Sequence, residues 1–156
     1  LLMLIENDKR GVELQLLYSD EKFAVPENVY IIGMMNTADR SLAMIDYALR
    51  RRFSFFEVEP GFDSEGFIHY QNKLNNETLD NLISKVKDLN HEIAADKSLG
   101  KGFCIGHSYF CDRDVCTDEW LHSIVDYDIL PMLREYWFDD TNKIQRWENI
   151  LQGVFQ

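Results

Sequence analysis

Side chains that could do chemistry gather in one short stretch of the chain. Asn36 ends an apolar run, Asp39-Arg40-Ser41 follow it, and three adjacent arginines, Arg50-Arg51-Arg52, come soon after. A neutral amide can hold an attacking water or a phosphate oxygen, and arginines can stabilise the charge that develops as a γ-phosphoryl group is displaced. The pattern therefore indicates phosphoryl transfer. The alternative is a capping asparagine and a solvated arginine cluster that complements a helix dipole, and the residues alone leave both open.

A strand, a helix and a second strand would have to position these side chains. Val29–Met35 is apolar and rich in β-branched residues, which is typical of a parallel strand covered on both faces. Residues 42–52 have apolar side chains at helical spacing and predict a helix that ends at the arginines. Phe53–Val58 predicts a second short strand, stopped by Pro60-Gly61. Ligands of open α/β sheets bind beyond the carboxyl ends of the strands, where Asn36 would lie.

The first 25 residues predict smaller elements. Leu1–Asp8 fits the last turns of a helix, and Gly11 is placed like the residue just after its end. Val12–Val25 alternates weakly around a polar turn at Ser19-Asp20-Glu21, which predicts a short hairpin or an extended loop. Because the chain opens with Leu1, apolar and without a capping residue before it, we expect a fragment of a longer protein.

Beyond the second predicted strand the periodicity becomes helical. Asn76 can cap a helix whose apolar residues recur from Leu79 to Ile93. Thr117 opens another helix, which Pro131 is expected to kink or split. Ile144–Leu151 marks a last helix.

Composition limits the class of protein. The chain has 156 residues, of which 46% are hydrophobic, so it can bury a core, and its net charge of −11 argues against broad nonspecific binding to nucleic acid. No apolar run reaches the roughly 20 residues that span a bilayer, so we expect no membrane association. Three cysteines cannot all pair within one chain, and no signal-peptide pattern is present, so we expect a reducing, cytoplasmic location.

Two segments match a known family at the right separation. The first runs from Val25 to Ala43 and contains Asn36-Thr37-Ala38-Asp39-Arg40-Ser41, and the second runs from Asp46 to Phe55 and contains Ala48-Leu49-Arg50-Arg51-Arg52-Phe53. Both closely resemble the McrB-type AAA+ GTPases, the motor subunits of restriction systems that act on methylcytosine-containing DNA. The resemblance runs from Leu1 to about Gly153 and includes Glu57, Pro60-Gly61-Phe62-Asp63, Gly100-Lys101-Gly102-Phe103, Gly106-His107-Ser108-Tyr109-Phe110 and Tyr136-Trp137-Phe138-Asp139-Asp140.

This resemblance implies a fold of the α/β plus α class. The chain would be a partial AAA+ (P-loop NTPase-like) α/β core followed by a helical lid subdomain. Residues 1–60 would form the C-terminal part of the α/β subdomain, with the sensor-1 strand and the arginine-finger helix. Residues 61–156 would form the lid.

The resemblance also implies roles for the polar residues. Asn36 resembles the sensor-1 residue that helps orient the hydrolytic water near the γ-phosphate. Arg51 and Arg52 resemble arginine fingers, presented to the nucleotide of the neighbouring subunit, whereas Arg50 has the alternative of stabilising the helix end.

Four further residues would lie around the nucleotide or the subunit interface. Asp39 and Arg40 resemble interface residues that surround sensor 1. His107 and Ser108 resemble a nucleotide-facing, sensor-2-like segment, although a glycine-aromatic turn that packs the lid explains the same residues.

The resemblance further implies cofactors and partners. The family uses GTP and Mg²⁺ and assembles as a ring, expected here to be a hexamer, with a McrC-like nuclease subunit. Methylated DNA would bind through regions outside this chain. The chain has no Gly-x-x-x-x-Gly-Lys-Ser/Thr phosphate loop and no apolar strand that ends in Asp-Glu. We therefore expect this chain alone to bind neither GTP nor Mg²⁺ and to be inactive.

Two other functional interpretations compete with this one. Asn36-Thr37-Ala38-Asp39 is close to the guanine-binding Asn-Lys-x-Asp motif of G proteins, but Thr37 replaces the lysine, and the following helix and arginines favour sensor 1. The chain could instead be a non-catalytic acidic module that binds a protein, or part of an ATP-using AAA+ remodelling protein. Cys111–Asp140 holds nine acidic residues against two basic ones, which fits a solvated helical face or a docking surface for a basic partner.

Cysteines and histidines between residues 104 and 122 are candidate metal ligands by residue type. Their spacing lacks the close Cys-x-x-Cys pairs of zinc sites, so we expect no metal site. The residues concerned are Cys104, His107, Cys111, Cys116 and His122.

Overall fold

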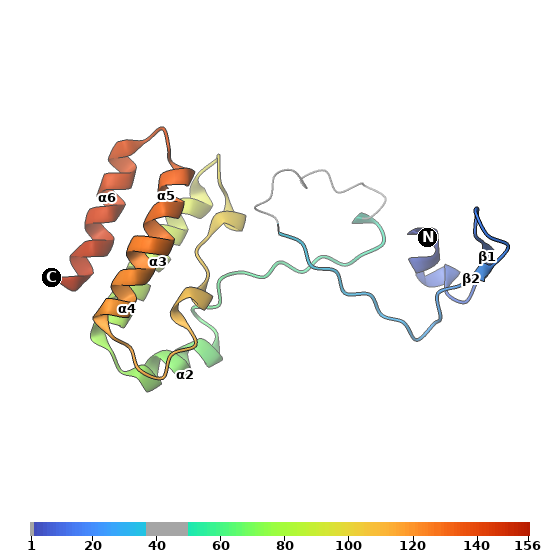
Figure 1. Ribbon diagram of the computed structural model, residues 1–156, viewed down its shortest axis with the longest axis horizontal. Helices are drawn as coiled ribbons and strands as arrows, with labels where there is room; N and C mark the ends of the chain where they lie inside the picture. Colours follow the sequence, from blue (N-terminus) through green and yellow to red (C-terminus); the bar gives the residue numbers. More distant parts are fainter. Residues whose placement is uncertain (1, 37–49) are drawn as a thin grey trace. The chain divides into compact units, whose positions relative to one another are not determined.

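The computed structural model describes residues 2–36 and 50–156 (Figure 1). It divides the chain into two compact units, Leu1–Glu57 and Val58–Gln156. Residues 42–49 of the helix predicted over residues 42–52 lie outside the described residues, and so do Asp39 and Arg40.

Unit 1 contains two short 3-10 helices and a small hairpin. Its elements are η1 (Leu2–Ile5), η2 (Asn7–Lys9), β1 (Leu14–Gln15) and β2 (Lys22–Phe23). The strands β1 and β2 pair antiparallel, with Leu14 opposite Phe23, which confirms the predicted hairpin. Gly11 has a φ of +75° and donates its N–H to the Val25 carbonyl at 2.9 Å. The predicted helix tail is present as 3-10 turns, which suit pieces this short.

Neither of the strands predicted at Val29–Met35 and Phe53–Val58 is present in the described residues. Val29–Asn36 and Ser54–Val58 form no strand, and Tyr30, Ile32 and Met34 are 89%, 91% and 97% exposed. A buried parallel strand needs hydrogen-bonding neighbours and covered faces, whereas the described residues supply only the two-residue ladder of β1 and β2. The described part of the fold is therefore mostly helical with a small two-stranded sheet.

Unit 2 is a helical bundle. Its longer elements are α2 (Glu65–Leu74), α3 (Glu77–Ala95), α4 (Asp118–Ser123), the π-helix η6 (Ile124–Ile129), α5 (Leu130–Tyr136) and α6 (Thr141–Gln152). Its short 3-10 helices are η4 (Lys101–Phe103), η5 (His107–Phe110) and η7 (Gly153–Phe155). No helix in the described ranges is both long and apolar enough to cross a membrane.

Side-chain caps fix where the helices of unit 2 begin. The Asn76 carboxamide oxygen accepts from the Leu79 N–H at 2.8 Å, and the Thr117 hydroxyl accepts from the Trp120 N–H at 3.3 Å, so both predicted starts are confirmed. The helix α2 has no predicted counterpart, although its cap, Ser64, is a residue type that favours helix starts.

The core of unit 2 forms around α3. Leu79, Leu82, Val86, Leu89 and Ile93 recur at helical spacing and are fully buried. The helix α3 contacts α6, and α5 also contacts α6, so the three lie side by side (Figure 1). Leu130, Leu133, Trp147 and Leu151 complete this side of the core.

Pro131 splits the predicted helix as expected. It follows the first residue of α5, directly after the π-helix η6. Proline lacks an N–H, and its ring clashes with the carbonyl four residues earlier, so the regular α-helical bonding pattern cannot continue through it. The wider turns of η6 accommodate this interruption.

A polar network ties the end of α3 to α6. The Asp96 carboxylate accepts from the Ser98 hydroxyl at 2.7 Å, the Trp137 indole N–H at 2.9 Å and the Lys143 ammonium at 3.0 Å. The Lys143 ammonium also lies 4.2 Å from the centroid of the Trp137 ring. These donors, Ser98 first, hold the pKa of Asp96 well below its usual range.

Candidate functional site

The residues predicted to act at the nucleotide are divided between the two units. Asn36 and the arginines belong to unit 1, whereas His107 and Ser108 belong to unit 2. Asn36 is exposed and is the last described residue before position 50.

The three arginines have different environments. Arg50 and Arg51 are exposed, whereas the Arg52 side chain is only 19% exposed. One terminal nitrogen of Arg52 lies 2.5 Å from a carboxylate oxygen of Glu6, and this ion pair holds the guanidinium within unit 1. Arg51 is therefore the exposed member of the predicted finger pair. Glu6 could not be predicted as the partner of Arg52, because nothing in the spacing of the two residues indicates their contact.

His107 forms a hydrogen bond within unit 2. Its Nδ1 accepts from the Gly61 N–H at 2.9 Å, so the neutral ring carries its proton on Nε2. The ring packs edge-to-face against Phe62 and Phe67, with centroids 6.1 and 5.6 Å away. Ser108, next to it, is exposed. These contacts fit the alternative interpretation, in which the glycine-aromatic turn around His107 serves packing within unit 2.

Asn90 fastens the loop that carries His107. Its amide nitrogen donates to the Ile105 carbonyl at 2.8 Å, and its carboxamide oxygen accepts from the Ile105 N–H at 2.6 Å. Ile105 is 1% exposed, so these two bonds satisfy backbone groups that water does not reach. The loop is thereby held against α3.

Replacing Asn90 by alanine should lower the free energy of unfolding by about 2–3 kcal/mol, because two buried backbone groups of Ile105 would lose their partners. Urea unfolding of the chain measures this loss. Asn149→Ala on the exposed side of α6 is the control, expected to stay within about 0.5 kcal/mol of the parent. Equal stability of the two variants would contradict the role of Asn90.

The three cysteines are free, half-buried thiols. Burial raises the pKa of Cys104, Cys111 and Cys116, which makes their thiolates less available. Within residues 2–36 and 50–156, no group of three histidine, cysteine or acidic side chains is arranged to hold a metal ion.

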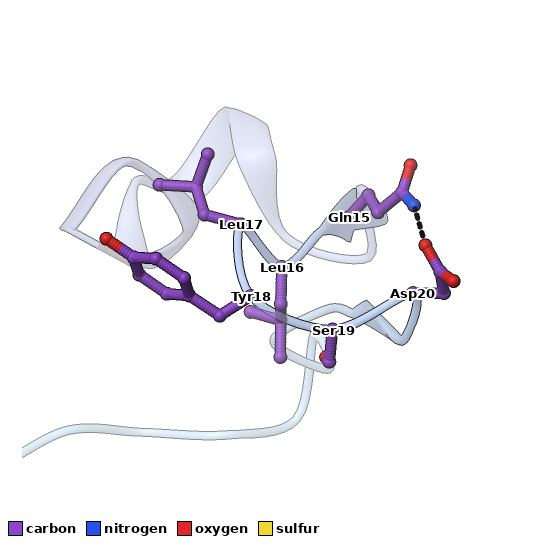
Figure 2. A pocket seen from close by; sticks show the side chains of 6 residues that line it. All are labelled: Gln15, Leu16, Leu17, Tyr18, Ser19 and Asp20. Carbon is purple, nitrogen blue, oxygen red and sulfur yellow. Dashed lines mark hydrogen bonds between the residues drawn. The ribbon is translucent and has the colours of Figure 1, made fainter.

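A surface hollow lies at the tip of the hairpin (Figure 2). It is lined by Gln15–Asp20, with the Gln15 amide donating to Asp20 at 3.2 Å on one side and Leu17 and Tyr18 on the other. Leu17 and Tyr18 are almost fully exposed. None of the residues predicted to act at the nucleotide lines this hollow.

The sequence of this chain is similar to those of known proteins. Residues 81–145 match the family model described as the McrB alpha-helical lid domain. Over 97% of its length the chain is 52% identical to a protein of Escherichia coli strain K12, the "Type IV methyl-directed restriction enzyme EcoKMcrB subunit". The chain spans 36% of the length of that relative. The chain is therefore a homologue of McrB and contains the McrB lid domain.

Proposed function

We propose that this chain is the C-terminal part of an AAA+ GTPase motor in a modification-dependent DNA restriction complex. The observation that carries this proposal is 52% identity, over nearly the whole chain, to a subunit of a methyl-directed restriction enzyme. Residues 1–60 contribute to the α/β subdomain, and residues 61–156 form the lid. GTP hydrolysis in the complete protein drives DNA translocation and cleavage by a partner nuclease.

Exposed apolar segments support the proposed α/β core. Val29–Met35 and Ser54–Val58 form no helix or strand, and side chains such as Ile32, Met34 and Phe56 are 91%, 97% and 90% exposed. Soluble monomers rarely leave long apolar segments uncovered, and unpaired extended backbone is ready to join a sheet. In the complete protein, we propose that these segments pair with strands of the AAA+ core.

The proposed mechanism uses a carboxamide and guanidinium groups. Asn36 orients the attacking water by hydrogen bonding, and Arg51 and Arg52 neutralise charge on the γ-phosphoryl group of the neighbouring subunit. The exposure of Arg51 suits a reach across a subunit interface. Arg52 would have to leave Glu6, or be aimed by it, to act in the same way.

The remaining predicted residues keep supporting roles. We propose that Asp39 and Arg40 act at the subunit interface around sensor 1 and that Arg50 stabilises the helix end or the interface. The assignment of His107 and Ser108 to a nucleotide-facing segment stays a prediction, which competes with the contact between His107 and Gly61.

The phosphates and Mg²⁺ would be bound largely by other parts of the complete protein. The chain contains no Gly-x-x-x-x-Gly-Lys-Ser/Thr sequence, and its described residues form no group that fits a metal ion. We therefore propose no role for residues of this chain in chemistry that depends on Mg²⁺. The ring, the McrC-like nuclease and the methylated DNA are likewise proposed for the complete protein.

The purified 156-residue chain should show no Mg²⁺-dependent GTP hydrolysis above the buffer rate, because it lacks a phosphate loop. A phosphate-release assay with the chain and, as control, the complete protein tests this expectation. Turnover by the chain alone would contradict it.

The proposed function is tested on the complete protein with its nuclease partner. GTP and ATP are offered separately, with methylated or unmethylated DNA of the same sequence. The proposal predicts GTP hydrolysis and cleavage of the methylated DNA only. ATP-dependent turnover without cleavage would favour the AAA+ remodelling alternative.

One observation favours a second candidate function, a module that binds a basic protein. Tyr127 and Phe138 are both 80% exposed, and each has acidic neighbours in the segment Cys111–Asp140. In the same assay, the absence of any nucleotide hydrolysis by the complete protein would favour this interaction module.

A further inference from the structure

The start of the lid unit is fastened to a loop far along the chain. The Gly61 N–H donates to His107 Nδ1 at 2.9 Å, and the Lys101 ammonium donates to the Glu59 carboxylate at 2.6 Å. Both contacts join residues that are more than 40 positions apart. They bind the entry segment Glu59–Phe62 to the loop at residues 100–110.

The backbone at Gly61 lies close to the His107 ring. A Cβ added at Gly61 would lie 3.0 Å from Cε1 of the His107 ring, which is closer than nine in ten real Cβ contacts. The ring is also held between Phe62 and Phe67 by edge-to-face contacts. Glycine at position 61 therefore lets the backbone N–H reach the imidazole, and two aromatic rings fix the imidazole in place.

The same loop is also fixed two residues before His107. Asn90 on α3 makes two hydrogen bonds to Ile105, which is buried in the core. The entry segment is thus connected through His107 and this loop to the longest helix of the lid. Movement of α3 must carry residues 59–62 with it.

We infer that His107, assisted by Lys101, is a positioning residue that fixes the entry segment Glu59–Phe62 to the helical body of unit 2. Its consequence for catalysis rests on the proposed function, because a lid whose first residues are firmly attached keeps one arrangement over the nucleotide in each cycle. Loosening this anchor would slow turnover without removing a nucleotide contact.

Amide hydrogen exchange of the 156-residue chain tests the anchor without any nucleotide. His107→Phe keeps an aromatic ring but has no acceptor, whereas His107→Asn keeps a short acceptor near the position of Nδ1. The Gly61 amide should exchange about tenfold faster in His107→Phe, since one hydrogen bond is lost, and should be largely restored in His107→Asn. An unchanged Gly61 exchange rate in His107→Phe would overturn the inference.

The same experiment includes a check on folding. Exchange at Val86, in the middle of α3, should be unchanged in a folded variant. If His107→Phe fails this check, Lys101→Ala replaces it, because Lys101 is exposed and its loss should not disturb the core. Faster exchange at Gly61 with Val86 unchanged supports the anchor in that variant, and an unchanged Gly61 rate counts against it.

Turnover by the complete protein separates positioning from direct nucleotide binding. A positioning role predicts that His107→Phe lowers kcat several-fold with KM for GTP unchanged, and that His107→Asn recovers most of kcat. A raised KM with kcat unchanged, in His107→Phe and Ser108→Ala alike, would overturn the inference in favour of a nucleotide-facing segment. If the unmodified complete protein hydrolyses no GTP, the proposed function fails, and the exchange experiment still decides the anchor.

Discussion

Replacing Arg51 or Arg52 by alanine in the complete protein should lower kcat for GTP hydrolysis by about 10³–10⁵-fold, the usual effect of removing an arginine finger. The physical reason is that charge spreading over the transferred phosphoryl group would lose a fixed cation in a site with little water. Binding of GTP should change much less, because most contacts to the ground state come from elsewhere. Steady-state turnover and equilibrium nucleotide binding, measured on the same preparations, check both halves of this prediction.

Two further variants make the prediction specific. Arg134→Ala removes an exposed arginine that pairs with Glu148 on the lid, and it should leave turnover unchanged. Glu6→Gln removes the charged partner of Arg52 and keeps the arginine. Turnover of this variant therefore shows whether the ion pair orients Arg52 for catalysis or holds it away from the nucleotide. Turnover at the parent rate in both Arg51→Ala and Arg52→Ala would remove the finger assignment.

Replacing Asp96 by alanine should lower the free energy of unfolding of the lid by about 2–4 kcal/mol. The Trp137 indole N–H is buried with only 3% of the residue exposed, and it would lose its acceptor, while Lys143 would lose a charged partner. Urea unfolding followed by tryptophan fluorescence measures the loss. Asp128→Ala, on an exposed acidic residue, is the matched control and should have an effect within about 0.5 kcal/mol.

The contribution of Asp96 should also depend on pH in one direction. The pKa of its carboxyl is depressed in the folded lid, whereas in the unfolded chain it is near the ordinary value of about 3.9. Its stabilisation is therefore complete above about pH 5 and is lost as pH falls below about 4 toward the folded pKa. The difference in stability between the parent and Asp96→Asn should shrink over that range, and a constant difference would show that the charge of Asp96 is not involved.

Local signals predicted the lid well. The apolar spacing from Leu79 to Ile93, the caps at Asn76 and Thr117 and the break at Pro131 each depend on neighbours within about a turn, and the structure has all of them. The strand Val29–Met35 depends instead on neighbouring strands, which the described residues do not supply. Composition typical of a buried strand cannot by itself produce one.

The contacts of the candidate site could not be predicted from the sequence in this way. The ion pair of Arg52 with Glu6 and the hydrogen bond of His107 with Gly61 each join residues more than 40 positions apart. No periodicity or cap encodes such pairs, because they depend on how whole segments pack. The residue types at Asn36 and Arg51 did indicate phosphoryl chemistry, and their roles stay predictions that depend on the complete ring.

The central claim, that this chain supplies arginine fingers to a GTP site on a neighbouring subunit, is tested most directly by mixing two inactive forms of the complete protein. One form carries Arg51→Ala and Arg52→Ala, and the other has its phosphate-binding lysine replaced. We predict that each form alone hydrolyses GTP at no more than about 10⁻³ of the parent rate, and that the mixture regains a substantial fraction, because intact arginines of one form complete the intact nucleotide site of the other. A mixture as inactive as its components, although mixed rings form, would contradict the account.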